Sequence, residues 1–326
     1  MTVGALVRGE RRSRGRSSAS PAPAPQPVDQ STRFELPADI ETLHIATPDE
    51  ALRVYQRHPE GSVPLIFLHE LGGAAEQWAA QLAAVGPKIR AIAYDMRGHG
   101  GSRGDLEGSQ SDPEGIQADD RARYSLDAGI LDLARVVDGL DLDPPVLVGH
   151  GFGASIAAEY AAGHPQQVAG ILLVDPAGDQ SRVPAAQRSA LLDQLRRDPG
   201  EETAWQFRQL LTAARTGVAE RILHHLAEAS SEALLEGFES AVAYNPVPTL
   251  RRYPGPTRCL VSDLNTLPYS LPRLMPELPS QAIPGTSHWL MMDQPDTLWE
   301  ILVDFLEEIY PTPSTLSDGT AAPPFP

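Results

Sequence analysis

The chain has 326 residues, of which 41% are apolar, so it is long enough to bury a large core and is not disordered throughout. Its formal net charge of −17 disfavours nucleic acid and anionic lipid as partners. The single cysteine, Cys259, excludes an internal disulfide and a structural zinc site, and we expect it to be a buried thiol in a reducing compartment.

Both ends of the sequence are rich in residues that pack poorly. The first segment contains several arginines, and Arg11 and Arg12 resemble a twin-arginine export signal, but no apolar segment follows them. No apolar run approaches the roughly 20 residues that a membrane-spanning helix needs. We therefore expect disordered tails at 1–32 and 311–326, no membrane partner and a cytoplasmic location.

From residue 40 onward, short apolar runs alternate with amphipathic segments, which is the pattern of an α/β protein. Strands are expected at 40–47, 51–57, 63–70, 88–95, 144–151, 168–175, 257–263 and 280–285, and helices at 75–85, 125–140, 152–164 and 295–310. Such apolar strands are typical of a parallel sheet that is covered on both faces. The acidic stretch 101–123 is expected to be a long flexible loop.

The alternation stops between residues 177 and 250. Four helical segments follow one another there, at 184–197, 201–215, 218–229 and 231–244, with no strand between them. This pattern predicts a helical cap at 177–250, inserted into a sheet domain that comprises residues 33–176 and 251–310.

Five motifs follow one another along the chain: FLHELGG at 67–73, YDMRGHGGS at 94–102, GHGFG at 149–153, LLVDPAGD at 172–179 and PGTSHWLMMDQP at 284–295. Each is weak alone, but in this order they resemble the α/β-hydrolase superfamily over about 270 residues. The resemblance implies a mostly parallel central sheet flanked by helices. It also implies a pocket for a small-molecule substrate or ligand between cap and sheet, without organic cofactor or metal.

The motif GHGFG has the layout of the family's nucleophile elbow, G-x-S-x-G, whose tight turn lifts a serine above the sheet. Gly149 and Gly153 occupy the two flanking positions, and His150 occupies the variable one. Gly151 stands where the nucleophile should be. The frame of the elbow is therefore present, but its nucleophile position is vacant.

The resemblance assigns the remaining catalytic roles. His288, in GTSHW after the last strand, occupies the place of the catalytic histidine. The acid that orients it is Asp175, which we favour, or Asp263, although Asp175 would equally serve as a structural turn residue. The backbone amides of Leu71 and Phe152 take the place of the oxyanion-hole donors.

The family's usual His-Gly pair is His69-Glu70 here, which puts a carboxylate next to this anion site, and we expect the Glu70 side chain to turn out to solvent. If it points inward, it would weaken oxyanion binding or supply an acid or base. The stretch HELGG begins like the zinc motif H-E-x-x-H, but Gly73 replaces the second histidine, so zinc is not expected. Ser102 is not on an elbow, and His224 and His225 on a cap helix are expected to be ordinary surface or packing residues.

Several functions are open to a site without its nucleophile. Loss of the serine would leave a water-sized space beside His288, so we favour single-step hydrolysis of small esters, lactones or related substrates by water that His288 activates. Such degenerate sites retain roughly 10³–10⁴-fold catalysis. The alternatives are a ligand-binding pseudo-enzyme, proton abstraction or C–C cleavage by His288, and an ordinary serine hydrolase carrying a Ser-to-Gly change. The hydrolase hypothesis predicts that Gly151→Ser raises ester turnover sharply.

Overall fold

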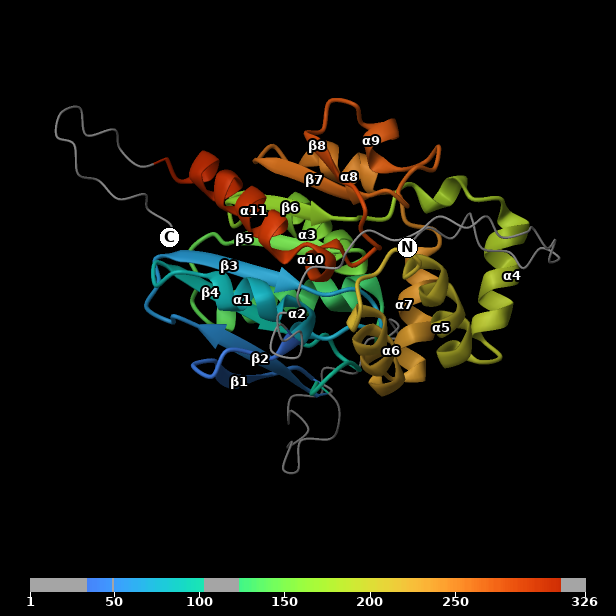
Figure 1. Ribbon diagram of the computed structural model, residues 1–326, viewed down its shortest axis with the longest axis horizontal. Coiled ribbons are helices and arrows are strands. Elements are labelled where there is room, and N and C mark those ends of the chain that lie inside the picture. The colour runs from blue at the N-terminus through green and yellow to red at the C-terminus, as the bar shows by residue number, and fades with distance from the viewer. Residues whose placement is uncertain (1–33, 49, 103–122, 312–326) are drawn as a thin grey trace, which may run out of the picture.

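The computed structural model describes residues 34–48, 50–102 and 123–311, which form an eight-stranded sheet with helices on both faces (Figure 1). The expected tails and nearly all of the expected acidic loop lie outside these ranges. The strands are β1 (Glu41–Ala46), β2 (Ala51–Arg57), β3 (Val63–Leu68), β4 (Ile89–Tyr94), β5 (Val146–His150), β6 (Gly170–Val174), β7 (Thr257–Ser262) and β8 (Ser280–Ile283). They are ordered β1-β2-β4-β3-β5-β6-β7-β8.

Strand β2 pairs antiparallel with both β1 and β4, and every other neighbouring pair is parallel. The mostly parallel sheet expected from the sequence is therefore confirmed. All residues of β3, β5 and β6 are buried, as the unbroken apolar runs predict for central strands covered on both faces.

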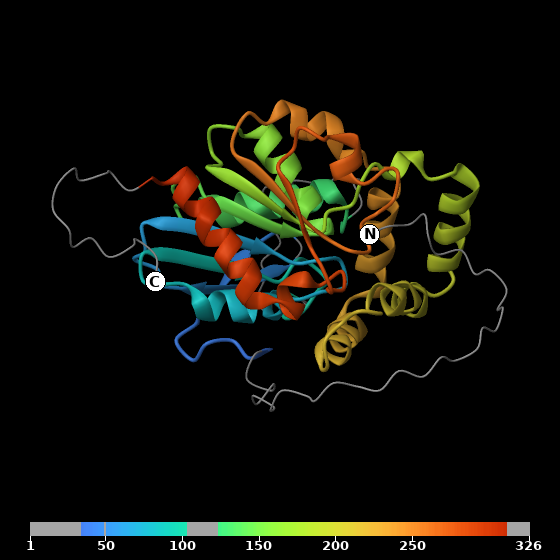
Figure 2. The same ribbon diagram turned by 45° about the horizontal axis from the view of Figure 1, so that its top comes forward.

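Helices from distant parts of the chain cover the two faces of the sheet. The first group comprises η3 (Ala75–Trp78), α1 (Ala79–Ala84), α10 (Leu290–Asp293) and α11 (Pro295–Ile309), and the second comprises α2 (Leu126–Gly139) and α3 (Phe152–Gly163). Helix α1 contacts α11 on one face, and α2 contacts α3 on the other (Figures 1 and 2). Within the described part of the chain, no helix is both long and apolar enough to cross a membrane.

Between β6 and β7 the chain contains helices and no strand, as the sequence pattern predicts. These helices are η4 (Gln180–Arg182), α4 (Ala185–Leu195), α5 (Pro199–Leu210), α6 (Val218–Glu228), α7 (Ser231–Ala241) and α8 (Pro246–Arg252). Helices α4 to α7 gather beyond the carboxyl ends of the parallel strands, while α8 packs against α3 (Figure 1). The division into a core and a cap with limits at 177 and 250 stays a prediction.

The junction of β5 and α3 forms the expected elbow. Strand β5 ends at His150, helix α3 begins at Phe152, and Gly151 between them has φ +51° and ψ −108°. This left-handed φ favours glycine because a side chain would strain the backbone there. Gly153 is needed for a close approach, since a Cβ atom on it would lie 2.6 Å from the carbonyl oxygens of Leu68 and His69.

Candidate active site

Asp175 and His288 form the expected acid–histidine pair. Asp175 follows the carboxyl end of β6 with φ 41°, a backbone conformation that costs energy outside glycine. Its Oδ2 atom lies 2.7 Å from Nδ1 of His288. Its carboxylate also accepts hydrogen bonds from the backbone amide and hydroxyl of Ser262 and from Nδ2 of Asn265. These donors hold the carboxylate in place, so Asp175 fixes the orientation of the imidazole.

Asp263, the other sequence candidate for the acid, lies elsewhere. It is exposed, and its Oδ2 atom accepts a hydrogen bond of 2.8 Å from the backbone amide of Gly285. Its neighbour Asn265 is the residue from this loop that reaches the site, where it donates to Asp175. The sequence left the choice of acid open, and the structure places Asp175, not Asp263, against His288.

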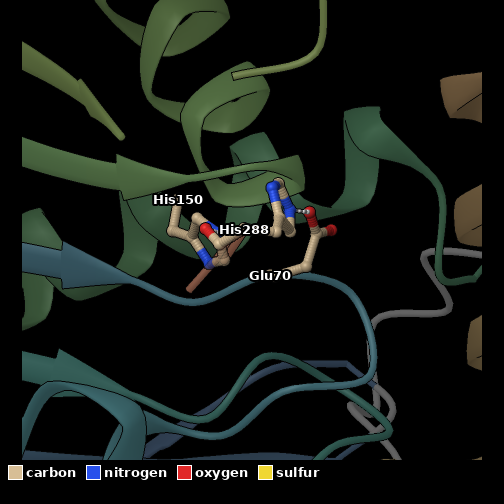
Figure 3. Close-up of side chains that lie close together, drawn as sticks. All are labelled: Glu70, His150 and His288. Atoms are coloured by element: carbon tan, nitrogen blue, oxygen red, sulfur yellow. Dashed lines mark hydrogen bonds and ion pairs between the residues drawn. The ribbon is translucent and has the colours of Figure 1, made fainter. Parts of the chain in front are cut away.

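Glu70 does not turn out to solvent, and that expectation is wrong. Its side chain is 0% exposed. Oε1 accepts hydrogen bonds from the backbone amides of Leu71 at 2.7 Å and Phe152 at 3.1 Å. Oε2 lies 3.1 Å from Nε2 of His288, and Figure 3 shows the carboxylate facing this ring. The two amides expected to form an oxyanion hole do converge, but a carboxylate of the protein itself already occupies them.

The Glu70 carboxylate also fills the position of the missing nucleophile. A Cβ atom placed on Gly151 would lie only 1.6 Å from Oε2 of Glu70, which is close to the length of a single covalent bond. Oε2 therefore lies at about bonding distance from that Cβ position and faces His288, as the hydroxyl oxygen of a serine at position 151 would be expected to do. The water-sized space expected beside His288 is not vacant, because the longer side chain from the loop after β3 reaches into it. That strand was expected to continue to residue 70, but it ends at Leu68.

Three buried ionisable groups determine the charge of the site. Burial would raise the pKa of Glu70, but its hydrogen bond to His288 and the charge of that ring lower this pKa to about 2. Burial would lower the pKa of His288, but its hydrogen bonds to Asp175 and Glu70 raise it. Burial would raise the pKa of Asp175 as well, but its hydrogen bond to His288 lowers it. Because both ring nitrogens of His288 face carboxylates, the site favours an imidazolium between Asp175 and Glu70.

His150 lies against His288, with 4.4 Å between the ring centroids. Its Nε2 atom lies 3.0 Å from the backbone carbonyl oxygen of His288, and because a carbonyl only accepts, this nitrogen carries the hydrogen. Burial, together with the charge of His288, lowers the pKa of His150 to about 3, so its ring is neutral. Its Nδ1 atom has no hydrogen-bond partner among the described residues.

Within the part of the chain that the structure describes, one group of side chains could hold a metal ion: Glu70, His150 and His288. Each offers one ligand atom, and these atoms lie within 4.8 Å of one another (Figure 3). One carboxylate and two imidazoles suit zinc and other transition metals. No sequence motif indicates this set, because its members are separated by 80 and 138 positions. A metal there would have to displace the hydrogen between Glu70 and His288.

A small hollow lies next to the site, between the elbow and α7. Its volume of about 10 Å³ is the space of roughly one water molecule. It is lined by Glu70, Phe152, Ser155, Ala177, Gln180, Phe238, Ala241 and Tyr244. A larger ligand would require the helical segment above the elbow to move.

The other sequence candidates have structural partners. The hydroxyl of Ser102 donates to the backbone oxygen of Asp95 and accepts from the backbone amide of Arg53, so it does not replace the nucleophile. His224 is exposed, while His225 is buried with Nε2 3.4 Å from a carboxylate oxygen of Glu76.

Cys259 is fully buried in β7, as expected. Three features of the site were not predicted from the sequence: the inward position of Glu70, the hydrogen bond that Asn265 donates, and the position of Gln180 beside the hollow. Glu70 carried a sequence signal, since it replaces the glycine of the family's His-Gly pair, and Asn265 carried one through its spacing from Ser262.

Residues 65–301 match the family model described as "Alpha/beta hydrolase family". The chain is 26% identical over 269 residues to the "Dihydrolipoyllysine-residue acetyltransferase component of acetoin cleaving system" of Pseudomonas putida, covering 79% of this chain and 67% of that protein. It is 32% identical over 155 residues to "Lipase LipV" of Mycobacterium tuberculosis, covering 47% of this chain and 53% of that protein. A solved esterase structure from Thermogutta terrifontis superposes with a TM-score of 0.66 at 22% identity, covering 82% of this chain and 99% of that one.

Proposed function

The chain belongs to the alpha/beta hydrolase family, and from this premise we propose that it is a hydrolase in which the Glu70 carboxylate acts as the nucleophile in place of the missing serine. One observation carries the proposal: Oε2 of Glu70 lies 1.6 Å from the place of a Cβ atom on residue 151 and 3.1 Å from Nε2 of His288, two distances that suit the hydroxyl of a serine nucleophile. A carboxylate with a pKa of about 2 is ionised at neutral pH, so it needs no base to activate it.

The occupied oxyanion hole favours attack on a saturated carbon. Hydrolysis of an ester by direct water attack needs the amides of Leu71 and Phe152 for the developing oxyanion of the substrate, but Oε1 of Glu70 holds both. Attack by Oε2 on a saturated carbon develops no such oxyanion. In this step the Oε2–carbon bond forms, the bond from that carbon to its leaving group breaks, and the electron pair goes to the leaving group. The product is an ester of Glu70.

The second step uses the groups that serine hydrolases use for deacylation. Neutral His288, oriented by Asp175, takes a proton from water, and the water oxygen adds to the carbonyl carbon of the Glu70 ester. The negative charge develops on Oε1, which already accepts hydrogen bonds from both amides. The intermediate collapses to an alcohol and the Glu70 carboxylate. This retains the expected role of His288 in activating water, but moves it to the second half of the reaction.

Isotope transfer in a single turnover tests the proposal. The enzyme in excess is mixed with small alkyl epoxides or alkyl bromides in H₂¹⁸O, and the product and the Glu70 peptide are analysed by mass spectrometry. Attack by Glu70 predicts that the first product carries ¹⁶O and that ¹⁸O enters Glu70. Direct water attack would place ¹⁸O in the first product and contradict the proposal. Glu70→Gln should abolish turnover, while Glu76→Gln should not, because Glu76 is in η3 and contacts His225 and Arg221 instead of His288.

A second candidate function is ligand binding without turnover. The hollow beside Glu70 has room for about one water molecule, and both oxyanion-hole amides are already paired, which suits a site that no longer turns over substrate. In that case the same experiment would give neither product nor ¹⁸O in Glu70 with any electrophile, although compounds that bind would still raise the melting temperature.

A further inference from the structure

Gln180 is a buried residue whose side chain has no structural partner. It is the first residue of η4 and is 1% exposed. Its side-chain Oε1 and Nε2 atoms make no hydrogen bond within the described ranges of the chain. Leaving buried polar groups unpaired costs about 1–3 kcal/mol, and native structures rarely keep such groups without a reason.

Hydrogen bonds fix the backbone around Gln180, and its side chain is buried there. Its amide donates to the carbonyl oxygen of Tyr244, and its own carbonyl accepts from the amide of Val183. Asp179 caps η4 through the amide of Ser181. These bonds hold Gln180 on the wall of the hollow that Glu70 also lines. A carboxylate and an unpaired primary amide therefore share one small, otherwise mostly apolar space.

Resting on the proposed function, we infer that Gln180 binds the leaving group of the substrate and selects one that leaves as oxygen. A primary amide offers donors on Nε2 and an acceptor on Oε1. An epoxide oxygen accepts a hydrogen bond, and once the ring opens it becomes a hydroxyl that can also donate, so it can pair with both ends of the amide. A bromide leaves as a very weak base and gains little from a hydrogen bond, whereas an epoxide oxygen leaves as a strongly basic alkoxide and gains much more from the Nε2 donor. The amide is therefore suited to an epoxide oxygen, and the apolar lining is suited to a small apolar epoxide once the helical segment above the elbow moves to admit it.

The reaction with such a substrate balances without any added oxidant or reductant. Oε2 of Glu70 bonds to a ring carbon, the ring C–O bond breaks, and the electron pair stays on the oxygen, which takes a proton from water. The hydroxide left behind takes the proton that His288 releases, so the imidazole ring is neutral for the second step. The hydroxyalkyl ester of Glu70 is then hydrolysed by a second water to a diol. Negative charge grows on the leaving oxygen in the transition state, so the hydrogen bond from Gln180 strengthens there and should affect kcat.

Matched substrates on Gln180→Leu test this inference. With 1,2-epoxyhexane, we expect the rate of Glu70 ester formation to fall roughly 10- to 100-fold, which is the value of one or two hydrogen bonds. With 1-bromohexane the rate should change less than threefold. Gln206→Leu is the control, because this buried glutamine of α5 pairs with Glu202 and does not line the hollow. It should leave both rates unchanged.

The outcomes separate this inference from the proposed function. If Gln180→Leu slows both substrates equally, or neither, Gln180 does not recognise a leaving oxygen, yet the Glu70 ester still supports the proposed function. If no Glu70 ester forms with either substrate, the proposed function fails and the inference fails with it. We also expect Gln180→Leu to raise the melting temperature, because it removes two unpaired buried atoms. A merely structural glutamine would instead lower it without changing the epoxide-to-bromide ratio.

Discussion

Gly151→Ser alone should destabilise the protein rather than restore an esterase. The new Cβ atom would lie 1.6 Å from Oε2 and 2.5 Å from Cδ of Glu70, so the carboxylate would have to leave its place. It would lose the hydrogen bonds from Leu71 and Phe152 and its contact with His288. This revises the expectation from the sequence, where a vacant pocket made the serine alone seem sufficient.

The size of the effect follows from those contacts. Hydrogen bonds to a charged group are worth about 1.5–3 kcal/mol each, and a displaced carboxylate recovers part of this from Gln180 and Ser155 in the hollow. A net loss of about 3–5 kcal/mol is expected. For a protein of this size, at about 2 °C per kcal/mol, the melting temperature should fall by roughly 5–10 °C.

A double-mutant cycle with Glu70→Gly completes the assay. In Gly151→Ser combined with Glu70→Gly, the serine hydroxyl faces His288 and the two amides are free for a substrate oxyanion. The pair should recover most of the lost stability, with a favourable coupling of several kcal/mol, and should hydrolyse p-nitrophenyl acetate faster than either single variant. The reasoning is refuted if Gly151→Ser alone melts within 1 °C of the parent and gains full esterase activity.

Three further predictions concern the charged groups. The stability that ionised Glu70 contributes is present above pH 4.5 and is lost as the pH falls toward its folded pKa of about 2. Urea unfolding from pH 6 down to 2.5 should show a fall of about 3 kcal/mol in the free energy of unfolding. Glu70→Gln should flatten this pH dependence. The pKa of His288 is raised, so its stabilising contribution is complete below pH 6.5 and lost as the pH rises through the folded pKa. Hydrolysis of a preformed Glu70 ester, followed by stopped-flow mass spectrometry, should nevertheless speed up with pH, because only neutral His288 activates water. Asp175→Asn should slow that hydrolysis roughly 10³–10⁴-fold without slowing ester formation, so the adduct should accumulate; equal slowing of both steps would contradict this assignment.

The elbow could be predicted from the sequence because its determinants are local. Two flanking glycines and a short apolar strand before an alanine-rich helix are enough to define the turn at Gly151. The choice of acid could not be made in the same way. It depends on how the loops after β6 and β7 meet, where Ser262 and Asn265 both donate to Asp175 while Asp263 accepts from Gly285.

The inward position of Glu70 was missed for a different reason. A lone carboxylate belongs at the surface unless several donors offset its desolvation, and that rule predicted exposure. The donors come from Leu71, Phe152 and His288, which meet only in the folded chain. The usable signal was the pair of unusual residues: a side chain too large at position 70 and one too small at position 151. Each is a departure from the motif, and together they conserve the volume and the oxygen atom of the site.

Exchanging serine for this carboxylate changes the task of the histidine. A serine hydroxyl must lose a proton as it attacks, whereas Glu70 is already ionised and holds His288 in its protonated form. Protonated His288 cannot take a proton from water while that carboxylate is charged. Once Oε2 becomes part of an ester, the negative charge is gone, the pKa of His288 falls, and the ring becomes the base that the second step needs. The state of Glu70 itself thus sets the order of the two steps.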